Sequence, residues 1–333
     1  MKLRAGIVGL GRNWESRYLP ALRTLADRFE VRGICEQVAH RAERAARELG
    51  AIAVDGYRAL AARDDIDVIL CLSDQWYGVT PILAACDYGK AVYSAISFPL
   101  DASEAALLRQ RVDESGIAFM AELPRRHAPA TLRLKELIAT RLGTPRMLFC
   151  HRRAVVEPPT ATRRDQATES RDLMELVDWC GYVAGTPPTS VVAVRHADAE
   201  AEGLDDYQMM SLDYSAGGTT GTGCLAQISC GYYMPQQWEE AVTFRPPAAL
   251  QVACENGIAF IDLPTSLVWF DTAGRHMESL ESDRPVGEMM LAQFHRMVTS
   301  LVRHVSGLDD TLFAMKVVSA ASISQRKGRR MPL

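Results

Sequence analysis

The feature that most constrains this chain is a repeated order of short apolar runs and helical patterns over its first 122 residues. The runs are rich in β-branched residues, and leucines at helical spacing follow the first of them. Strands separated by single helices form a parallel sheet, because parallel neighbours need a crossover connection. The predicted strands cover residues 3–9, 29–35, 66–73, 90–95 and 117–122. The sequence therefore predicts an α/β domain over residues 1–122 with a doubly wound parallel sheet.

A different pattern begins after residue 122 and predicts a second domain over residues 123–333. One helical segment leads into longer alternating runs bounded by turns, which are typical of antiparallel strands. The helical segment is 130–143, and the predicted strands cover 207–215, 225–234, 249–263 and 266–271. We expect an α/β domain with a large open, mainly antiparallel sheet, packed on one face and either solvated or used for association on the other. Residues 155–170 are typical of a mobile loop, and the closing helices at 286–327 could return to pack on the first domain.

Composition excludes several classes of protein. Hydrophobic residues make up 48% and charged residues 23% of the 333 residues. No apolar run approaches the roughly 18 residues of a membrane span, and the first apolar stretch is too short for a signal peptide. A net charge of −4 argues against a nucleic-acid partner. We expect a cytoplasmic protein of two domains that binds neither nucleic acid nor membrane.

The eight cysteines predict neither disulfides nor a metal site. No two of them are separated by two residues, as zinc ligands often are. Several lie inside apolar runs. We interpret them as reduced core thiols.

A dinucleotide site is indicated where the first predicted strand ends. Gly9 and Gly11 follow this strand and precede a helix, and Glu36 ends the second strand. This spacing matches the Rossmann fingerprint, whose glycines permit a tight turn and let backbone N–H groups approach a pyrophosphate at the helix N-terminus. Trp14 stands where the third glycine belongs. Either the loop is one residue longer than usual, or the helix packs less closely on its strand.

Glu36 also indicates which dinucleotide binds. A carboxylate accepts hydrogen bonds from the 2′-hydroxyl of a ribose and repels a 2′-phosphate, so NAD is favoured over NADP. His40 and Arg41 follow closely and would weaken this preference. The alternative is that Glu36 is a solvated loop acid.

Four segments together resemble one protein family. They are AGIVGLGRNWESRYLPAL, DIDVILCLSDQWYGVTPILAACDYGKAVY, RRHAPATLRLKELIATRLGTPRMLF and AMKVVSAASISQRKGRRMPL. Through them the chain resembles the Gfo/Idh/MocA family, named after glucose-fructose oxidoreductase, inositol dehydrogenase and rhizopine catabolism. The resemblance implies a Rossmann domain followed by a domain with a large open sheet, and a homodimer or homotetramer built on that sheet. It also implies bound NAD(P) and a sugar, polyol or related small-molecule substrate.

One family signature, Glu-Lys-Pro, is changed in this chain. In the family its lysine positions the substrate and assists proton transfer. Here Ser97 and Phe98 precede Pro99 and stand where the family has its glutamate and lysine. If the alignment contains no two-residue insertion before Pro99, Ala95 and Ile96 stand there instead. The lysine is absent on either alignment, and lysine occurs only at positions 2, 90, 135, 316 and 327.

Beside the two glycines and Glu36, the predicted cofactor contacts are Arg12, Asn13, Ser73, Asp74 and Ser97.

A second family signature, Asp-x-x-x-His-x-x-Asp, is changed as well. The matching stretch RDLMELVDWCGYVAG has Arg171 at the first Asp, Glu175 at the His and Asp178 at the last Asp. Together with Tyr182 they form one polar stripe of a helix. We predict Glu175 as the general acid or base, with Asp178 and Arg171 as its partners. The alternative is a surface ion pair worth about 0.3–0.5 kcal/mol. Weaker candidates are Tyr93, Ser97 and His151.

Arginines are concentrated around the predicted substrate site. Planar guanidinium groups suit carboxylates and phosphates, so we expect an anionic or polyhydroxylated ligand. The predicted substrate contacts are Arg125, Arg126, Arg152 and Tyr182, with Arg153, Arg163 and Arg164 close by in the sequence. The alternative is that a lysine-poor chain uses arginine for its surface cations.

Three functions fit this pattern. The first is an NAD-dependent oxidoreductase acting on a hydroxyl of a sugar-like or acidic small molecule, in which the cofactor carries the hydride and a changed proton partner is tolerated. The second is a catalytically silent ligand-binding protein on the same fold, which the loss of the lysine and the histidine would suit. The third is redox-neutral bond cleavage assisted by tightly held NAD.

Overall fold

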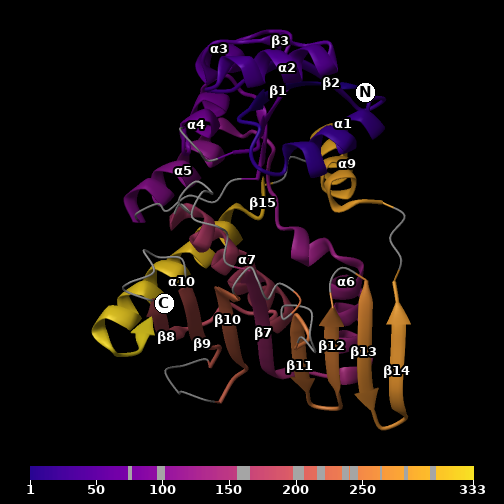
Figure 1. Cartoon of the computed structure of the whole chain (residues 1–333), viewed down its shortest axis with the longest axis vertical. Coiled ribbons are helices and arrows are strands. Elements are labelled where there is room, and N and C mark those ends of the chain that lie inside the picture. Colours follow the sequence, from indigo (N-terminus) through magenta and orange to yellow (C-terminus); the bar gives the residue numbers. More distant parts are fainter. Residues whose placement is uncertain are drawn as a thin grey trace. The chain divides into compact units, whose positions relative to one another are not determined.

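The chain divides into two compact units (Figure 1). The first comprises Met1–Pro124 and Asp283–Leu312, and the second comprises Arg125–Ser282 and Phe313–Leu333. This computed structural model describes residues 1–73, 77–95, 102–155, 166–197, 206–215, 222–234, 240, 247–262, 265–280, 284–300 and 305–333. The chain leaves the first unit after Pro124 and returns to it for Asp283–Leu312.

The first unit contains a seven-stranded sheet in the order β15-β6-β5-β4-β1-β2-β3, and all its neighbouring pairs are parallel. The strands are β1 (Leu3–Val8), β2 (Phe29–Cys35), β3 (Ile52–Ala53), β4 (Val68–Cys71), β5 (Ala91–Ser94), β6 (Phe119–Ala121) and β15 (Val305–Ser306). The strand order reverses between β1 and β4, which is where sheets of this kind bind ligands. The predicted doubly wound sheet is confirmed. Its edge strands β3 and β15 were not predicted, because a strand of two residues is too short to show an alternating pattern.

Helices connect these strands. They are η1 (Trp14–Tyr18), α1 (Leu19–Thr24), α2 (Ala39–Leu49), α3 (Tyr57–Ala61), α4 (Thr80–Asp87), α5 (Ala102–Ser115) and α9 (Val286–Thr299). α1 ends at Thr24, and the chain turns at Leu25, whose carbonyl accepts the N–H groups of Arg28 and Phe29. Although α9 follows the second unit's strands in sequence, its Phe294 lies in the core of the first unit with Tyr93.

The second unit contains a nine-stranded sheet in the order β14-β13-β12-β11-β7-β10-β9-β8-β16. The strands are β7 (Pro145–Val155), β8 (Ser190–Ala197), β9 (Asp206–Asp213), β10 (Leu225–Met234), β11 (Leu250–Cys254), β12 (Ile258–Asp262), β13 (Ser266–Asp271), β14 (Gly274–Ser279) and β16 (Met331–Pro332). β7 and β10 are parallel, and the other neighbouring pairs are antiparallel. The predicted open, mainly antiparallel sheet is confirmed.

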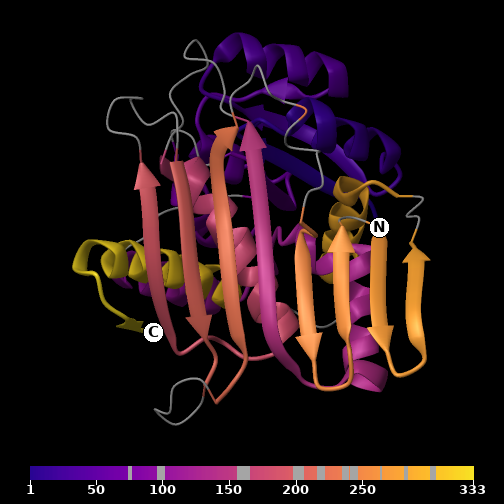
Figure 2. The ribbon, with the colours of Figure 1, turned by 60° about the horizontal axis from the view of Figure 1, so that its bottom comes forward.

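The helices of the second unit cover one face of this sheet (Figure 2). They are η2 (Pro124–His127, which begins at the unit boundary), α6 (Pro129–Leu137), η3 (Ile138–Leu142), α7 (Gln166–Ala184) and most of α10 (Leu308–Lys327). Residues alternate between the faces, so Leu148 and Cys150 are buried under the helices while Met147 is exposed on the other face. α7 begins at residue 166, so the predicted loop at 155–170 was too long at its end, and residues 156–165 lie outside the described part of the chain.

Three further findings concern the described part of the chain. No helix in it is both long enough and apolar enough to cross a membrane. The eight cysteines are free, and seven of them are buried. No cluster of three or more side chains suited to hold a metal ion occurs among the residues that were described.

Candidate functional site

The glycine loop lies directly against the end of β4. Gly9 and Gly11 have φ angles of 70° and 64°, a left-handed conformation that favours glycine. A Cβ atom on Gly9 would come within 2.6 Å of the Ser73 Cβ, and one on Gly11 within 2.4 Å of the Leu72 carbonyl oxygen. Both positions therefore require glycine for conformation and for space, as a loop that receives a pyrophosphate does.

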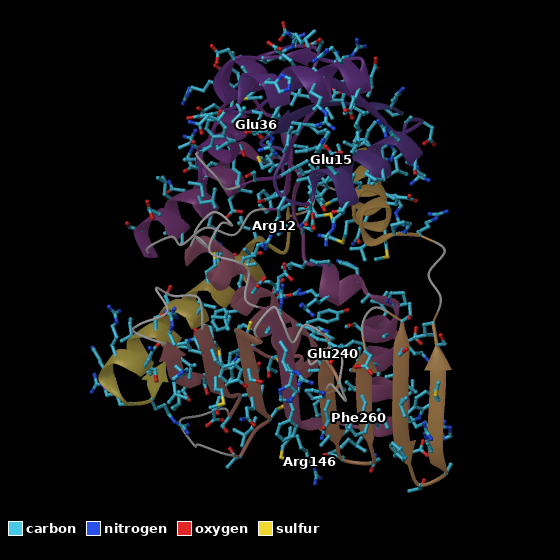
Figure 3. The ribbon with its side chains drawn as sticks, viewed as in Figure 1. Arg12, Glu15, Glu36, Arg146, Glu240 and Phe260 are labelled. Carbon is cyan, nitrogen blue, oxygen red and sulfur yellow. The ribbon has the colours of Figure 1, made fainter. Side chains whose placement is uncertain are left out.

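Glu36 lies at the same loop. Its Oε2 accepts the backbone N–H of Leu10 at 2.8 Å, and its Oε1 accepts that of Gln37 at 3.1 Å. Each carboxylate oxygen keeps further acceptor capacity for a ribose hydroxyl. Figure 3 labels Glu36 and Arg12 on the first unit. The Glu36 carboxylate is thus hydrogen-bonded to the loop, while its side chain is only half-buried.

Trp14 begins a π-helical turn, η1, immediately after the loop. The Asn13 carbonyl accepts the N–H groups of both Arg17, at 2.9 Å, and Tyr18, at 3.3 Å. A π-helical turn holds one residue more than an α-helical turn. The Trp14 side chain is buried in the core of the first unit, and the additional residue belongs to the π-helical turn.

These residues fit an adenine dinucleotide. The loop, Ser73 and Glu36 each follow the carboxyl end of a strand, on the edge of the sheet where such ligands bind. Arg12 is exposed and Asn13 is half-buried beside them. Asp74 and Ser97, the other two predicted contacts, lie outside the described residues.

In the second unit, α7 carries the polar stripe predicted from its sequence. Glu175 lies between two guanidinium groups: Arg125 Nε is 3.6 Å from its Oε2, and Arg171 Nε is 3.6 Å from its Oε1. The side chains are 18%, 18% and 13% exposed for Glu175, Arg125 and Arg171. The ion pair between Arg171 and Glu175 is therefore present, with both side chains mostly buried.

Asp178, one helical turn further on, pairs with Arg126 instead. Arg126 Nε donates to its Oδ2 at 2.8 Å, and the Arg126 Nη2 donates to its Oδ1. The Arg126 guanidinium lies 5.1 Å from the centre of the Tyr182 ring. Lys135 lies over the same ring and donates to the Tyr182 carbonyl at 3.0 Å, and burial lowers the pKa of Lys135. Tyr182 therefore contacts two cations.

Arg152 and Arg153 cannot serve one site, because neighbouring residues of a strand face opposite sides of the sheet. Arg152 donates to Oδ1 of the buried Asp172 on α7 at 2.7 Å. On the other side, the His151 Nδ1 lies 2.7 Å from the Ser229 Oγ, and burial together with the charge of Arg153 lowers the pKa of His151. His151 and Arg153 are thus separated from the α7 stripe.

Two acidic residues of these clusters were missed in the sequence. Asp172 lies beside Arg171, but its partner Arg152 is on another element, so spacing along the helix does not reveal the pair. Glu122 directly follows β6 and accepts the hydroxyls of Tyr18 and Tyr93. Tyr93, a weaker catalytic candidate, is thus fully buried in the first unit and bonded to a carboxylate.

Comparisons with known proteins agree with this architecture. Residues 3–121 match the family described as "Oxidoreductase family, NAD-binding Rossmann fold", Gfo/Idh/MocA. A dehydrogenase of Aspergillus oryzae, aclE, is 28% identical over 146 residues, which cover 41% of this chain and 40% of that protein. The chain thus spans less than half the length of this curated relative.

Solved structures match over the full chain. The aldose-aldose oxidoreductase of Caulobacter crescentus has a TM-score of 0.83 at 16% identity and covers 100% of both chains. Myo-inositol 2-dehydrogenase of Lactobacillus plantarum has a TM-score of 0.77 at 18% identity, again over 100% of both. UDP-N-acetylglucosamine 3-dehydrogenase of Acidithiobacillus ferrooxidans reaches 0.78 at 18% identity, over 98% of this chain and 99% of that one. At such identities the similarity establishes the fold, and the match to the family of oxidoreductases with an NAD-binding Rossmann fold covers residues 3–121.

Proposed function

We propose that this protein is an NAD-dependent oxidoreductase that acts on a hydroxyl group of a sugar, a polyol or a related acidic small molecule. The observation that carries the proposal is the glycine loop, in which two left-handed glycines lie against β4 and Glu36 bonds to the loop. The names of three structurally similar enzymes refer to aldose, inositol and UDP-N-acetylglucosamine chemistry, which supports this substrate class.

NAD is the proposed cofactor rather than NADP. The Glu36 carboxylate is held at the loop by the N–H groups of Leu10 and Gln37, and a 2′-phosphate on the adenosine ribose would meet its negative charge. When bound, NAD supplies the hydride acceptor for an alcohol. The chain itself has to bind the substrate and take up the hydroxyl proton.

Glu175 is the proposed acceptor of that proton. Two guanidinium groups flank its carboxylate at 3.6 Å, and a positioned carboxylate is one of the side chains that serve as general bases. Oxidation of an alcohol releases a hydride, which bound NAD would accept, and a hydroxyl proton, which the Glu175 carboxylate would take up. Arg171 would orient this carboxylate, and the Asp178 pair with Arg126 would fix the neighbouring turn of α7.

Arg125 is the proposed anchor for an anionic or hydroxyl-rich substrate. Its guanidinium lies 5.3 Å from the centre of the Trp179 ring, and its buried Nε has no hydrogen-bond partner among the described residues. By contrast, Arg126 and Arg152 donate to carboxylates within 2.8 Å. An acidic or phosphorylated sugar would complement the Arg125 guanidinium.

The open face of the nine-stranded sheet is the proposed contact with a second copy of the chain. Large apolar side chains are exposed on it, among them Val194 at 54% and Met277 at 68%. Large apolar side chains exposed on one face of a sheet are typical of association surfaces. The proposed assembly is a homodimer or homotetramer.

Titration with NADH and NADPH, followed by nicotinamide fluorescence, tests the cofactor first. Micromolar binding of NADH, with weaker binding of NADPH, supports the proposal, and no binding of either refutes it. A panel of neutral sugars, polyols, sugar acids and sugar phosphates then tests turnover by NADH formation. Cofactor binding without turnover of any substrate would favour a catalytically silent binder, and product without net NADH would favour redox-neutral cleavage.

A further inference from the structure

A buried carboxylate in the first unit has no part in the proton transfer described above. Glu122 directly follows β6, and its side chain is 0% exposed. Its Oε2 accepts the Tyr18 hydroxyl at 2.7 Å and the Tyr93 hydroxyl at 2.6 Å, while its Oε1 accepts the Arg17 guanidinium. Both oxygens of the carboxylate are therefore used by protein donors.

These donors tie three elements together. Arg17 and Tyr18 are the last two residues of the π-helical turn η1, and Tyr93 belongs to β5. The backbone N–H of Glu122 also donates to the Ser94 carbonyl at 2.8 Å, at the end of β5. Glu122 thus joins η1 to the carboxyl ends of β5 and β6, on the edge of the sheet that the glycine loop occupies.

The position of η1 matters because this turn begins directly after the glycine loop. In the Rossmann fingerprint a third glycine permits close packing of the helix on its strand. Here Trp14 occupies that region and is buried in the core. The turn needs another means of being held against the sheet, and hydrogen bonds from its last two residues to one fixed carboxylate supply it.

The charges in this cluster suit a permanent structural role. Burial lowers the pKa of Arg17, but the Glu122 carboxylate outweighs it and leaves the pKa raised. Burial and then the same carboxylate raise the pKa of Tyr93 well above its ordinary value, so its hydroxyl stays a donor. A buried charge without its partner is strongly unfavourable, so Glu122 and Arg17 hold each other in place.

We propose that Glu122 is a positioning residue for dinucleotide binding: it fixes the π-helical turn and, through it, the backbone of the glycine loop. This inference rests on the proposed nucleotide function. In the Rossmann fingerprint, close packing at the third glycine holds the first helical turn against the sheet, and here the Glu122 carboxylate has this role.

The test compares Glu122→Gln with Asp67→Asn. Asp67 also accepts a guanidinium and a backbone N–H, both from Arg4, but it lies at the amino ends of β1 and β4, on the opposite edge of the same sheet. We expect Glu122→Gln to raise the Kd for NADH about ten-fold or more, because small misplacement of binding groups is costly, and Asp67→Asn to leave it unchanged. If the single variant fails to fold, the double variant Arg17→Met/Glu122→Gln, which removes both charges, is titrated with NADH in its place.

Two readouts separate positioning from simple loss of folded protein. Misfolding lowers the number of NADH sites per chain, whereas displacement of the loop raises Kd with the number of sites unchanged. In nucleotide-free protein, hydrogen exchange at residues 10–18 should be faster in Glu122→Gln and unchanged in Asp67→Asn. An unaltered NADH Kd in folded Glu122→Gln overturns the inference alone. Absence of NADH binding by the unaltered protein overturns the proposed function, and the inference with it.

Discussion

Replacing Gly11 by alanine should damage dinucleotide binding far more than it damages folding. The new Cβ would lie 2.4 Å from the Leu72 carbonyl oxygen, against an ordinary contact of 3.4 Å or more, so the loop or the end of β4 has to move by about 1 Å (3.4 − 2.4 = 1.0). The left-handed conformation, with φ of 64°, adds about 1–2 kcal/mol of backbone strain.

Gly50→Ala is the matched control for Gly11→Ala. Gly50 has a φ of 65°, but a Cβ there meets nothing within 4 Å, so this variant carries the backbone strain without the displacement. We expect both variants to lose thermal stability, and Gly11→Ala alone to weaken NADH binding, on the order of 100-fold for a shift of this size. The assay is NADH fluorescence titration beside thermal unfolding. Unchanged NADH affinity in Gly11→Ala would refute the reasoning that the loop backbone binds the cofactor.

Three further outcomes follow from the site and the sheet. Glu175→Gln should lower turnover about 10²–10⁴-fold with NADH affinity unchanged. The control Glu136→Gln, at an exposed carboxylate, should leave turnover unchanged. Equal turnover in both variants would exclude Glu175 from the chemistry. Burial and the charge of Arg126 lower the pKa of His127 below its ordinary 6.5. Below pH 6.5 the unfolded chain therefore binds a proton at His127 more readily than the folded protein does, so the free energy of unfolding falls as the pH drops. Thermal unfolding should then show a smaller acid loss in His127→Gln, and an identical pH profile contradicts this. Val194→Glu should reduce the mass of the assembly measured by analytical ultracentrifugation. The control Val38→Glu, at an exposed valine of the first unit, should not change it. An unchanged mass in both variants would argue against the open face as the interface between copies.

The sites divide into parts that spacing reveals and parts that it does not. Arg171, Glu175, Asp178 and Tyr182 were predicted as one stripe because helical periodicity alone brings them to one face. Their partners could not be predicted, since Arg125 and Arg126 approach from another segment. The carboxylate that closes the Arg152 pair, Asp172, was missed for the same reason.

By itself the sequence determined the two kinds of sheet, the glycine loop and the polar stripe of α7. The strands β2, β10 and β13 were predicted to the residue, because alternation, turn residues and β-branched runs act locally. Only the tertiary structure decided that Trp14 enters the core through a π-helical turn and that Glu122 binds that turn across the sheet. Tertiary structure also decided that Arg152 of β7 lies on the face covered by α7, where it binds Asp172. Such contacts join residues up to 105 positions apart, and their energy depends on burial and on partners that no local pattern contains.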